Sequence, residues 1–402
     1  MTPEDLGFNS KRLDLVGAVG RRLVDDGRLP GALVQVARRG EVVYSDRYGL
    51  ADRERDQPVS QDTIFRIYSM TKPITAVAVM QLYEKGLVLL EDPIEMYIPA
   101  FADMQVWDGG TRERPVLRPA TRSITVHDLL RHTSGLTYGF RQQHALDAIY
   151  RRVGLGNLNQ PDLTLADMCE QLGKLPLLFD PGTQWHYSMS TDVLAHLVEI
   201  VAEQSFSSYL REFITDPLDM FETRFAVPEE HADRLAALYM DTPDGMVLAD
   251  DPTTSAYLAE PSFESGGGGL VSTIDDYQRF ASMLLAGGEL RGNRVLGRRT
   301  IEFMTTNHLP GAIDMNEAGQ TLFPTEAMAG RGFGLGFGVI VDPAKHAAVS
   351  SVGEFGWGGM ASTSFWVDPT EEITVIFMTQ LAPSNSYPIR RLLRSAVNQA
   401  LL

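Results

Sequence analysis

Apolar residues near the N-terminus follow a helical spacing and then a strand-like one. Between Ser10 and Asp26 they recur every three or four positions, which is the spacing of one helix face, and Ser10 is a suitable N-cap. The apolar runs 31–37 and 41–45 are separated only by Arg38-Arg39-Gly40. Two such runs around a short glycine-containing turn are typical of a β-hairpin. We therefore predict one helix followed by a hairpin.

The C-terminal third of the chain repeats the strand pattern. Strands are predicted over 333–341, 362–367 and 373–378, and a final helix over 387–401. The turn residues Asp368-Pro369-Thr370 separate the last two strands. This end of the chain therefore resembles the N-terminal end in combining strands with one helix.

The long middle stretch has a different character. From Thr71 to Glu264 the spacing of apolar residues is mostly helical, with loops rich in proline, glycine and aspartate near 108–122 and 241–253. We expect both termini to build one sheet, with the helical region inserted between them. The corresponding domains are 1–75 together with 265–402, and 76–264.

Composition excludes several classes of function. The 402 residues carry 35 Lys+Arg against 52 Asp+Glu, a net charge of −17 that repels nucleic-acid phosphates, so no nucleic acid is expected as a partner. Cys169 is the only cysteine, so neither an intramolecular disulfide nor a cysteine-cluster metal site is possible, and we predict a buried thiol. The histidines show no metal-ligand spacing, so we predict no metal and no cofactor.

No targeting or membrane segment is visible in the sequence. The first residues are acidic where a signal peptide would be basic, and the apolar stretch after them is broken by Asp14. The longest apolar runs, such as 76–80 and 375–378, are far shorter than the roughly 18–20 residues that cross a bilayer. We predict no membrane insertion and a cytoplasmic protein.

The tetrapeptide Ser69-Met70-Thr71-Lys72 carries candidate chemistry. A serine hydroxyl is a weak nucleophile at neutral pH and needs a base within hydrogen-bond reach. If Ser69 lies in the first turn of the helix that follows, Lys72 lies on the same helix face and its amine reaches the hydroxyl. The backbone N–H of Ser69, at the N-terminus of that helix, would then also help to stabilise an oxyanion.

The motif alone is weak, because Ser-x-x-Lys also occurs by chance, but its surroundings are specific. The segment 64–73 resembles the active-site segment of penicillin-recognising serine enzymes. Further segments resemble the same enzymes in the same order: 129–136, 179–182 followed by Tyr187-Ser188, and 266–273. The chain is therefore similar to the class C β-lactamase-like group and, within it, to the family VIII carboxylesterases.

This resemblance implies a fold and an active site. The fold would be α+β and like that of β-lactamases and penicillin-binding proteins: a mainly antiparallel sheet flanked by helices, a helical second region, and the active site in the cleft between them. Tyr187 would shuttle the proton with Lys72. Met189 stands where the family has an asparagine that holds the acyl-amide side chain of a β-lactam.

The family's Lys-Thr-Gly motif also differs here. It appears as Trp357-Gly358-Gly359, which family VIII esterases share, so the cation that recognises a β-lactam carboxylate is replaced. The resemblance implies that these residues and Met189 contact substrate, and that the backbone N–H of Met360 is the second oxyanion donor. Arg331 is the alternative carboxylate-binding residue if β-lactams are substrates.

Competing chemistries have weaker support in the same sequence. No serine has glycine at both −2 and +2, so the α/β-hydrolase elbow is absent. A Ser-His-Asp triad stays open, because His127, His132, His144 or His186 could meet a serine in space. The glycines of 266–269 lack the lysine of a phosphate loop and are better explained by close backbone approach.

The sequence thus predicts a serine carboxylesterase that hydrolyses short-chain acyl esters of small molecules through a Ser69 acyl-enzyme. An acyltransferase, or a weak β-lactamase of the same fold, is the alternative with the same chemistry. A catalytically inactive binding module is the alternative of another class, and retention of Ser69, Lys72 and Tyr187 together argues against it.

Overall fold

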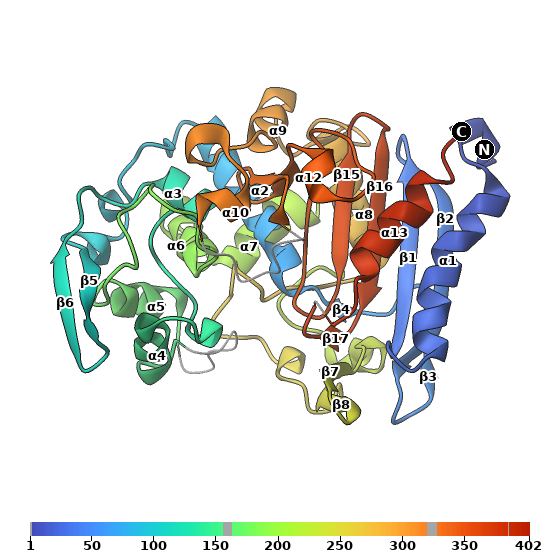
Figure 1. The fold of residues 1–402 in the computed structure, drawn as a ribbon, viewed down its shortest axis with the longest axis horizontal. Helices are drawn as coiled ribbons and strands as arrows, with labels where there is room; N and C mark the ends of the chain where they lie inside the picture. Colours follow the sequence, from blue (N-terminus) through green and yellow to red (C-terminus); the bar gives the residue numbers. More distant parts are fainter. Residues whose placement is uncertain (1, 156–162, 320–327, 385) are drawn as a thin grey trace.

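An eight-stranded antiparallel sheet forms the centre of the computed structural model, which describes residues 2–155, 163–319, 328–384 and 386–402. The strand order is β12-β13-β14-β15-β16-β1-β2-β3, so strands from both ends of the chain lie side by side (Figure 1). The strands are β1 (Gly31–Arg38), β2 (Glu41–Asp52), β3 (Gln57–Pro58), β12 (Arg331–Phe333), β13 (Gly338–Ile340), β14 (Phe355–Gly358), β15 (Ser364–Asp368) and β16 (Ile373–Thr379). The predicted hairpin at 31–45 is confirmed as β1–β2.

One strand prediction was wrong. The predicted strand 333–341 is two short strands, β12 and β13, which pair with each other. The chain turns between them at Gly336, whose φ of 90° suits glycine, and the Gly334 N–H donates to the Phe337 carbonyl at 2.7 Å. Alternating glycines therefore mark a tight hairpin here.

Helices cover both faces of the sheet. On one face lie α1 (Ser10–Asp25) and α13 (Ile389–Asn398), which confirm the predicted terminal helices (Figure 1). Against the other face lies α8 (Ile274–Leu285), and α2 (Thr71–Glu84) belongs to the core on that side. Because side chains alternate along a strand, Val34 and Phe377 enter the α1 and α13 core while neighbouring residues such as Leu33 enter the other.

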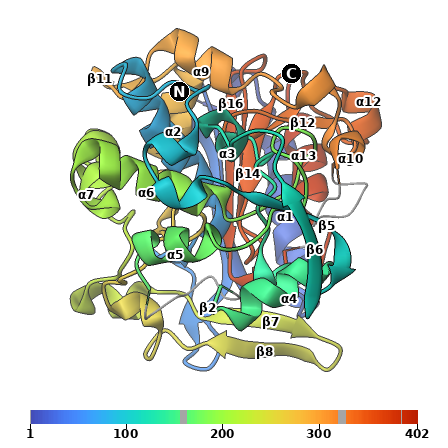
Figure 2. The same ribbon diagram turned by 90° about the vertical axis from the view of Figure 1, so that its left-hand side faces the viewer.

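The middle of the chain is mainly helical, and it packs beside α2 through α6 (Figure 2). Its α-helices are α3 (Val126–Leu130), α4 (Ala145–Arg152), α5 (Leu165–Leu172), α6 (Ser190–Ala202) and α7 (Phe206–Leu210). The loops predicted near 108–122 and 241–253 are instead hairpins, β5 (Gln105–Thr111) with β6 (Arg114–Pro119) and β7 (Leu238–Thr242) with β8 (Gly245–Asp250). Glycines within these strands, Gly109 and Gly110 in β5 and Gly245 at the start of β8, gave them the composition of loops.

Further short elements of the described chain bear on the site or join the larger ones. They are the 3-10 turn η2 (Tyr68–Met70), β4 (Phe65–Arg66), β9 (Val271–Ser272), β10 (Glu289–Leu290), β11 (Asn293–Arg294), α9 (Arg298–Met304), α10 (Met315–Ala318), α12 (Pro343–His346) and β17 (Leu381–Ala382). Cys169 is buried in α5, as predicted. Within the described ranges, every helix is too short or too polar to span a membrane.

Candidate active site

Ser69 lies in η2, immediately before α2. We expected Ser69 in the first turn of the helix that follows it. The structure places Ser69 in the 3-10 turn that leads directly into that helix, which begins at Thr71. Ser69 is half-buried between the buried side chains of Tyr68 and Met70, and Tyr68 has a φ of 44°. Such left-handed backbone is uncommon outside glycine and is typical of strained functional sites. We call residues 68–72 the nucleophile segment.

Lys72 is brought to Ser69 as predicted. Its Nζ donates to Ser69 Oγ at 3.3 Å and to the Gly267 carbonyl at 2.6 Å, and the side chain is only 1% exposed. The same Nζ lies 4.4 Å from the ring centroid of Tyr187 and 5.4 Å from that of Tyr138. The amine therefore sits between the nucleophile and two tyrosine faces, within cation–π range of both.

Asp192, in the first turn of α6, is a buried acid that sequence reasoning missed. Its carboxylate accepts hydrogen bonds from Ser265 Oγ at 2.5 Å and from the Gly267 N–H at 2.9 Å. Burial raises the pKa of Asp192, while the charge of Lys72 and these hydrogen bonds act in the opposite direction. The backbone of one residue, Gly267, thus lies between the lysine and the acid, bonding Lys72 through its carbonyl and Asp192 through its N–H. No sequence spacing relates the three residues.

The glycines of 266–269 confirm the prediction of close backbone approach. A Cβ on Gly267 would lie 2.6 Å from Asp192 Oδ2, and one on Gly266 would lie 2.8 Å from the Thr191 carbonyl. Thr75 Oγ1 also donates to the Gly266 carbonyl at 2.8 Å. Any larger residue here would push this loop away from Lys72.

Tyr187 joins the nucleophile segment to the sheet. Its hydroxyl accepts a hydrogen bond from Trp357 Nε1 at 3.2 Å, and both side chains are buried. Its ring lies 4.8 Å from that of His132 and stacks on that of Trp185, with centroids 6.2 Å apart. Ser69, Lys72, Tyr187 and Trp357 therefore form one continuous contact chain.

None of the four candidate histidines hydrogen-bonds Ser69 in the described part of the chain. Instead, His132 Nδ1 lies 3.4 Å from Ser188 Oγ, His186 Nε2 pairs with Thr137 Oγ1 at 2.9 Å, His127 Nε2 lies 3.1 Å from His308 Nδ1, and His144 caps α4. Burial, with the charge of Lys72, keeps the pKa of His132 well below its usual range, so this ring is neutral. The hydrogen bond to Ser69 Oγ comes from a lysine, and this favours the Ser-x-x-Lys chemistry over a triad.

Residues 357–360, which we call the strand segment, lie directly against the nucleophile segment. The glycine at 359 permits this approach, because a Cβ there would lie 2.5 Å from the Ile67 carbonyl, two residues before Ser69. Met360 is 37% exposed, and in the described structure its N–H donates to no protein acceptor. That N–H is thus available to a bound group.

Two further features bear on substrate contact. Met189 is 3% exposed at the start of α6 and packs in the main core, so its predicted contact with substrate stays a prediction.

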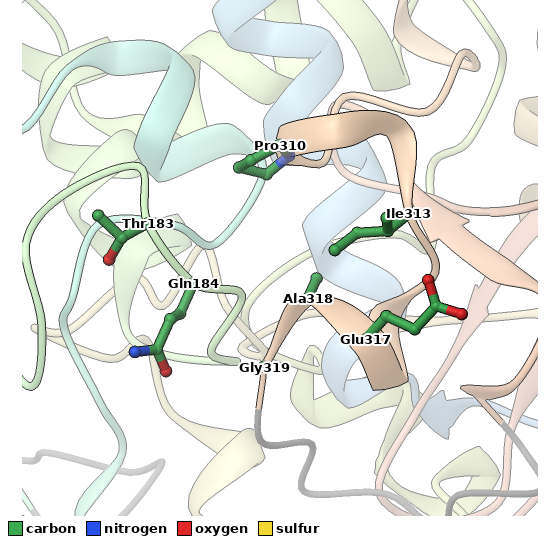
Figure 3. Close-up of a pocket in the computed structure, with 7 residues that line it drawn as sticks. All are labelled: Thr183, Gln184, Pro310, Ile313, Glu317, Ala318 and Gly319. Atoms are coloured by element: carbon green, nitrogen blue, oxygen red, sulfur yellow. The ribbon is translucent and has the colours of Figure 1, made fainter.

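A cavity of about 250 Å³ lies beside the Tyr187 loop, where Figure 3 shows Thr183 and Gln184 across from Ile313 and Ala318. The Trp185 N–H donates to the Ala318 carbonyl at 2.9 Å. Ala318, which lines this cavity, is therefore bonded to the residue two positions before Tyr187. Among the described residues, no group of three or more His, Cys, Asp or Glu side chains could hold a metal ion.

A serine with a buried lysine amine at its hydroxyl, in a chain built around a mainly antiparallel sheet, is typical of serine enzymes of the β-lactamase and penicillin-binding-protein fold. The family described as Beta-lactamase matches residues 18–398, and the chain belongs to this family. The predicted family and fold class are confirmed, and the chain is a serine hydrolase.

Three known proteins are similar to this chain over most of its length. Protein Rv1367c of Mycobacterium tuberculosis is 34% identical over 91% of this chain and 89% of its own length. Esterase EstB of Burkholderia gladioli is 31% identical over 98% of this chain and 96% of its own. The structure of EstCE1, a hydrolase with promiscuous acyltransferase activity, superposes with a TM-score of 0.82 at 28% identity, covering 96% of this chain and 98% of that one.

Proposed function

We propose that this protein is a serine carboxylesterase that hydrolyses short-chain acyl esters through a Ser69 acyl-enzyme. The observation that carries the proposal is the 3.3 Å contact between Lys72 Nζ and Ser69 Oγ, with the lysine buried against the ring of Tyr187. The similarity to Esterase EstB over nearly the whole chain supports an ester as substrate. The site lies in the proposed cleft between residues 76–264 and the sheet built from 1–75 and 265–402.

Acylation begins with attack of Ser69 Oγ on the ester carbonyl carbon. The hydroxyl proton passes to the Lys72 amine and on, through the Tyr187 hydroxyl, to the leaving alcohol oxygen. The Oγ–C bond forms and the carbon–alkoxy oxygen bond breaks, so the alcohol leaves with the proton. Buried Asp192 stabilises the ammonium of Lys72 during this transfer.

The negative charge of the tetrahedral intermediate needs fixed donors. The N–H groups of Ser69 and Met360 fill this role, because the strand segment lies directly against the nucleophile segment. Trp357 lies beside Tyr187 at the cleft wall, while Gly359 lets the strand segment approach the nucleophile segment closely. In deacylation, water adds to the acyl carbon and one of its protons passes, through Lys72 and Tyr187, to Ser69 Oγ as the Oγ–C bond breaks, so the carboxylic acid is released.

An acyltransferase is the second candidate, since an acceptor alcohol can replace water in the last step. The similarity to EstCE1, a hydrolase with promiscuous acyltransferase activity, favours this alternative specifically. Product analysis with p-nitrophenyl butyrate in the presence of methanol separates the two: butyric acid is expected as the main product, and predominance of methyl butyrate would favour transfer.

Hydrolysis of p-nitrophenyl acetate and butyrate by the wild type and by Ser69→Ala tests the proposal. We expect steady turnover by the wild type and none above background for the variant, because the nucleophile is removed. Equal turnover by Ser69→Ala and the wild type would contradict the proposal. So would a wild type without any turnover, which would favour a binding module.

A further inference from the structure

Arg390 lies behind the strand segment, on the face of the sheet opposite Trp357. It belongs to the first turn of α13, whose residues pack in the core shared with α1. Within β14, Trp357 enters the core on the active-site face, whereas Gly356 pairs with Trp366, which faces α13. Side chains alternate along a strand, so Gly358 also faces α13. Arg390 therefore approaches the site from outside the cleft.

The guanidinium of Arg390 bonds the backbone where β14 ends. Its Nη2 donates to the Gly359 carbonyl and to the Thr363 carbonyl, each at 3.0 Å. The Thr363 carbonyl also accepts the Gly359 N–H at 2.9 Å. The cation thus joins both ends of the connection between β14 and β15.

Gly358 makes room for this arrangement. A Cβ on Gly358 would lie 2.4 Å from Arg390 Nη2 and 2.6 Å from its Cζ, so the guanidinium rests on the bare backbone of the strand. The two glycines of Trp357-Gly358-Gly359 therefore differ in purpose. Gly358 admits Arg390 on one face, and Gly359 admits the backbone of Ile67.

The carbonyl that Arg390 holds belongs to the same peptide group as the N–H of Met360. A trans peptide is planar, and its C=O and N–H point in opposite directions. A hydrogen bond from a charged donor on the rear face therefore fixes the N–H pointing away from α13. The same bond polarises the peptide and strengthens its N–H as a donor.

We propose that Arg390 is a positioning residue for the oxyanion hole: it orients the Gly359–Met360 peptide so that the Met360 N–H meets the substrate oxyanion. The inference rests on the proposed function, which makes that N–H an oxyanion donor. The neighbouring Arg394 does not share this role, because it bonds Glu354 at 2.7 and 3.0 Å and covers Trp366. Burial and the charge of Arg394 lower the pKa of Arg390 to about 10, so it is protonated at neutral pH.

Steady-state kinetics of Arg390→Met and Arg390→Lys on p-nitrophenyl butyrate test the inference, with Arg391→Met as the matched control. Arg391 is the next residue of α13 and is exposed, so its variant should behave as the wild type. For Arg390→Met we expect kcat to fall about ten- to hundredfold with KM nearly unchanged, since a misaligned oxyanion donor acts only in the transition state. Arg390→Lys keeps a charged donor and should lose less.

Inhibition by an aryl trifluoromethyl ketone supplies a readout that a merely structural role would not move. Its adduct with Ser69 places an oxyanion in the hole, so its Ki should rise by the same factor by which kcat falls. Gly358→Ala should reproduce both effects, because its Cβ displaces the guanidinium, and it decides the matter if Arg390→Met does not fold. An unchanged kcat, or a lower kcat with an unchanged Ki, would overturn the inference while leaving the Ser69 esterase intact. An inactive wild type would instead contradict the proposed function.

Discussion

The nucleophile segment and the strand segment reach the same point in the molecule by different means. In residues 68–72, the serine and its lysine are three positions apart, and one helical turn brings them together. In residues 357–360, the orientation of one peptide depends on Arg390, 31 positions after Gly359 and on the far face of the sheet. The serine and its lysine are thus placed locally, whereas the Met360 N–H is placed by packing. We therefore expect abrupt losses from changes in the first segment and graded losses in the second.

Substitutions at Lys72 and Tyr187 should cause the largest losses short of removing Ser69. Lys72→Met and Tyr187→Phe are each expected to lower kcat about 10²–10⁴-fold, because each removes a group that carries the transferred proton. The double variant should be little worse than either single one, since members of a proton-transfer unit fail together. Steady-state kinetics on p-nitrophenyl butyrate measure both effects.

Two matched controls accompany these variants. Lys174 is an exposed lysine outside the site, and Tyr209 has a buried hydroxyl with no hydrogen-bond partner among the residues that the structure describes. Lys174→Met and Tyr209→Phe should both retain wild-type kcat. Substantial activity in the Lys72 and Tyr187 variants would point to a different base, with a histidine as the first candidate.

The strand segment should decide between esters and β-lactams. Trp357 replaces the family's lysine, and the loss of one charge-assisted hydrogen bond to a β-lactam carboxylate costs about 1.5–3 kcal/mol. Short-chain p-nitrophenyl esters should therefore exceed nitrocefin in kcat/KM by about ten- to more than a hundredfold, measured on one enzyme preparation. Equal efficiency on a penicillin would identify a β-lactamase and direct attention to Arg331, which lies over the ring of Trp357.

Acid should weaken the packing around two buried histidines. His186, which precedes Tyr187 in the chain, and His346, near Arg394 and Arg331, are buried, and burial is the main cause that lowers each pKa to about 3. In the unfolded chain the histidine pKa is about 6.5, so this chain binds more protons than the folded one between pH 6.5 and 3. The free energy of unfolding is therefore fully retained above pH 6.5 and falls below it, by up to about 1.4 kcal/mol per pH unit for each histidine.

Urea unfolding at pH 7, 6 and 5 measures this slope. His186→Gln and His346→Gln should each make the pH dependence shallower, and the double variant shallower still. A slope that is unchanged in both variants would show that other groups control acid stability.

Much of the fold could be predicted because the patterns are local or repeated. The terminal helices, the first hairpin and the last two strands follow directly from apolar spacing, and Ser69 with Lys72 from a short motif. The hairpins β5–β6 and β7–β8 could not be predicted, because the glycines within their strands have positive φ values and resemble those of loops.

The residues that support the site could not be predicted from the sequence for a different reason. Asp192 and Arg390 reach it only through contacts with backbone distant in sequence, at Gly267 and Gly359. No spacing records such contacts. The glycines themselves were visible in the sequence, but not the side chains for which they leave room.

Covalent labelling by a fluorophosphonate tests the identity of the nucleophile without reference to any substrate. Intact-protein mass spectrometry should show one adduct per chain, and peptide mapping should place it on Ser69, because only this serine has a buried lysine amine at its hydroxyl in the described structure. Ser69→Ala should take up no label. An adduct on another serine, or labelling that persists in Ser69→Ala, would contradict the assignment of Ser69 as the nucleophile.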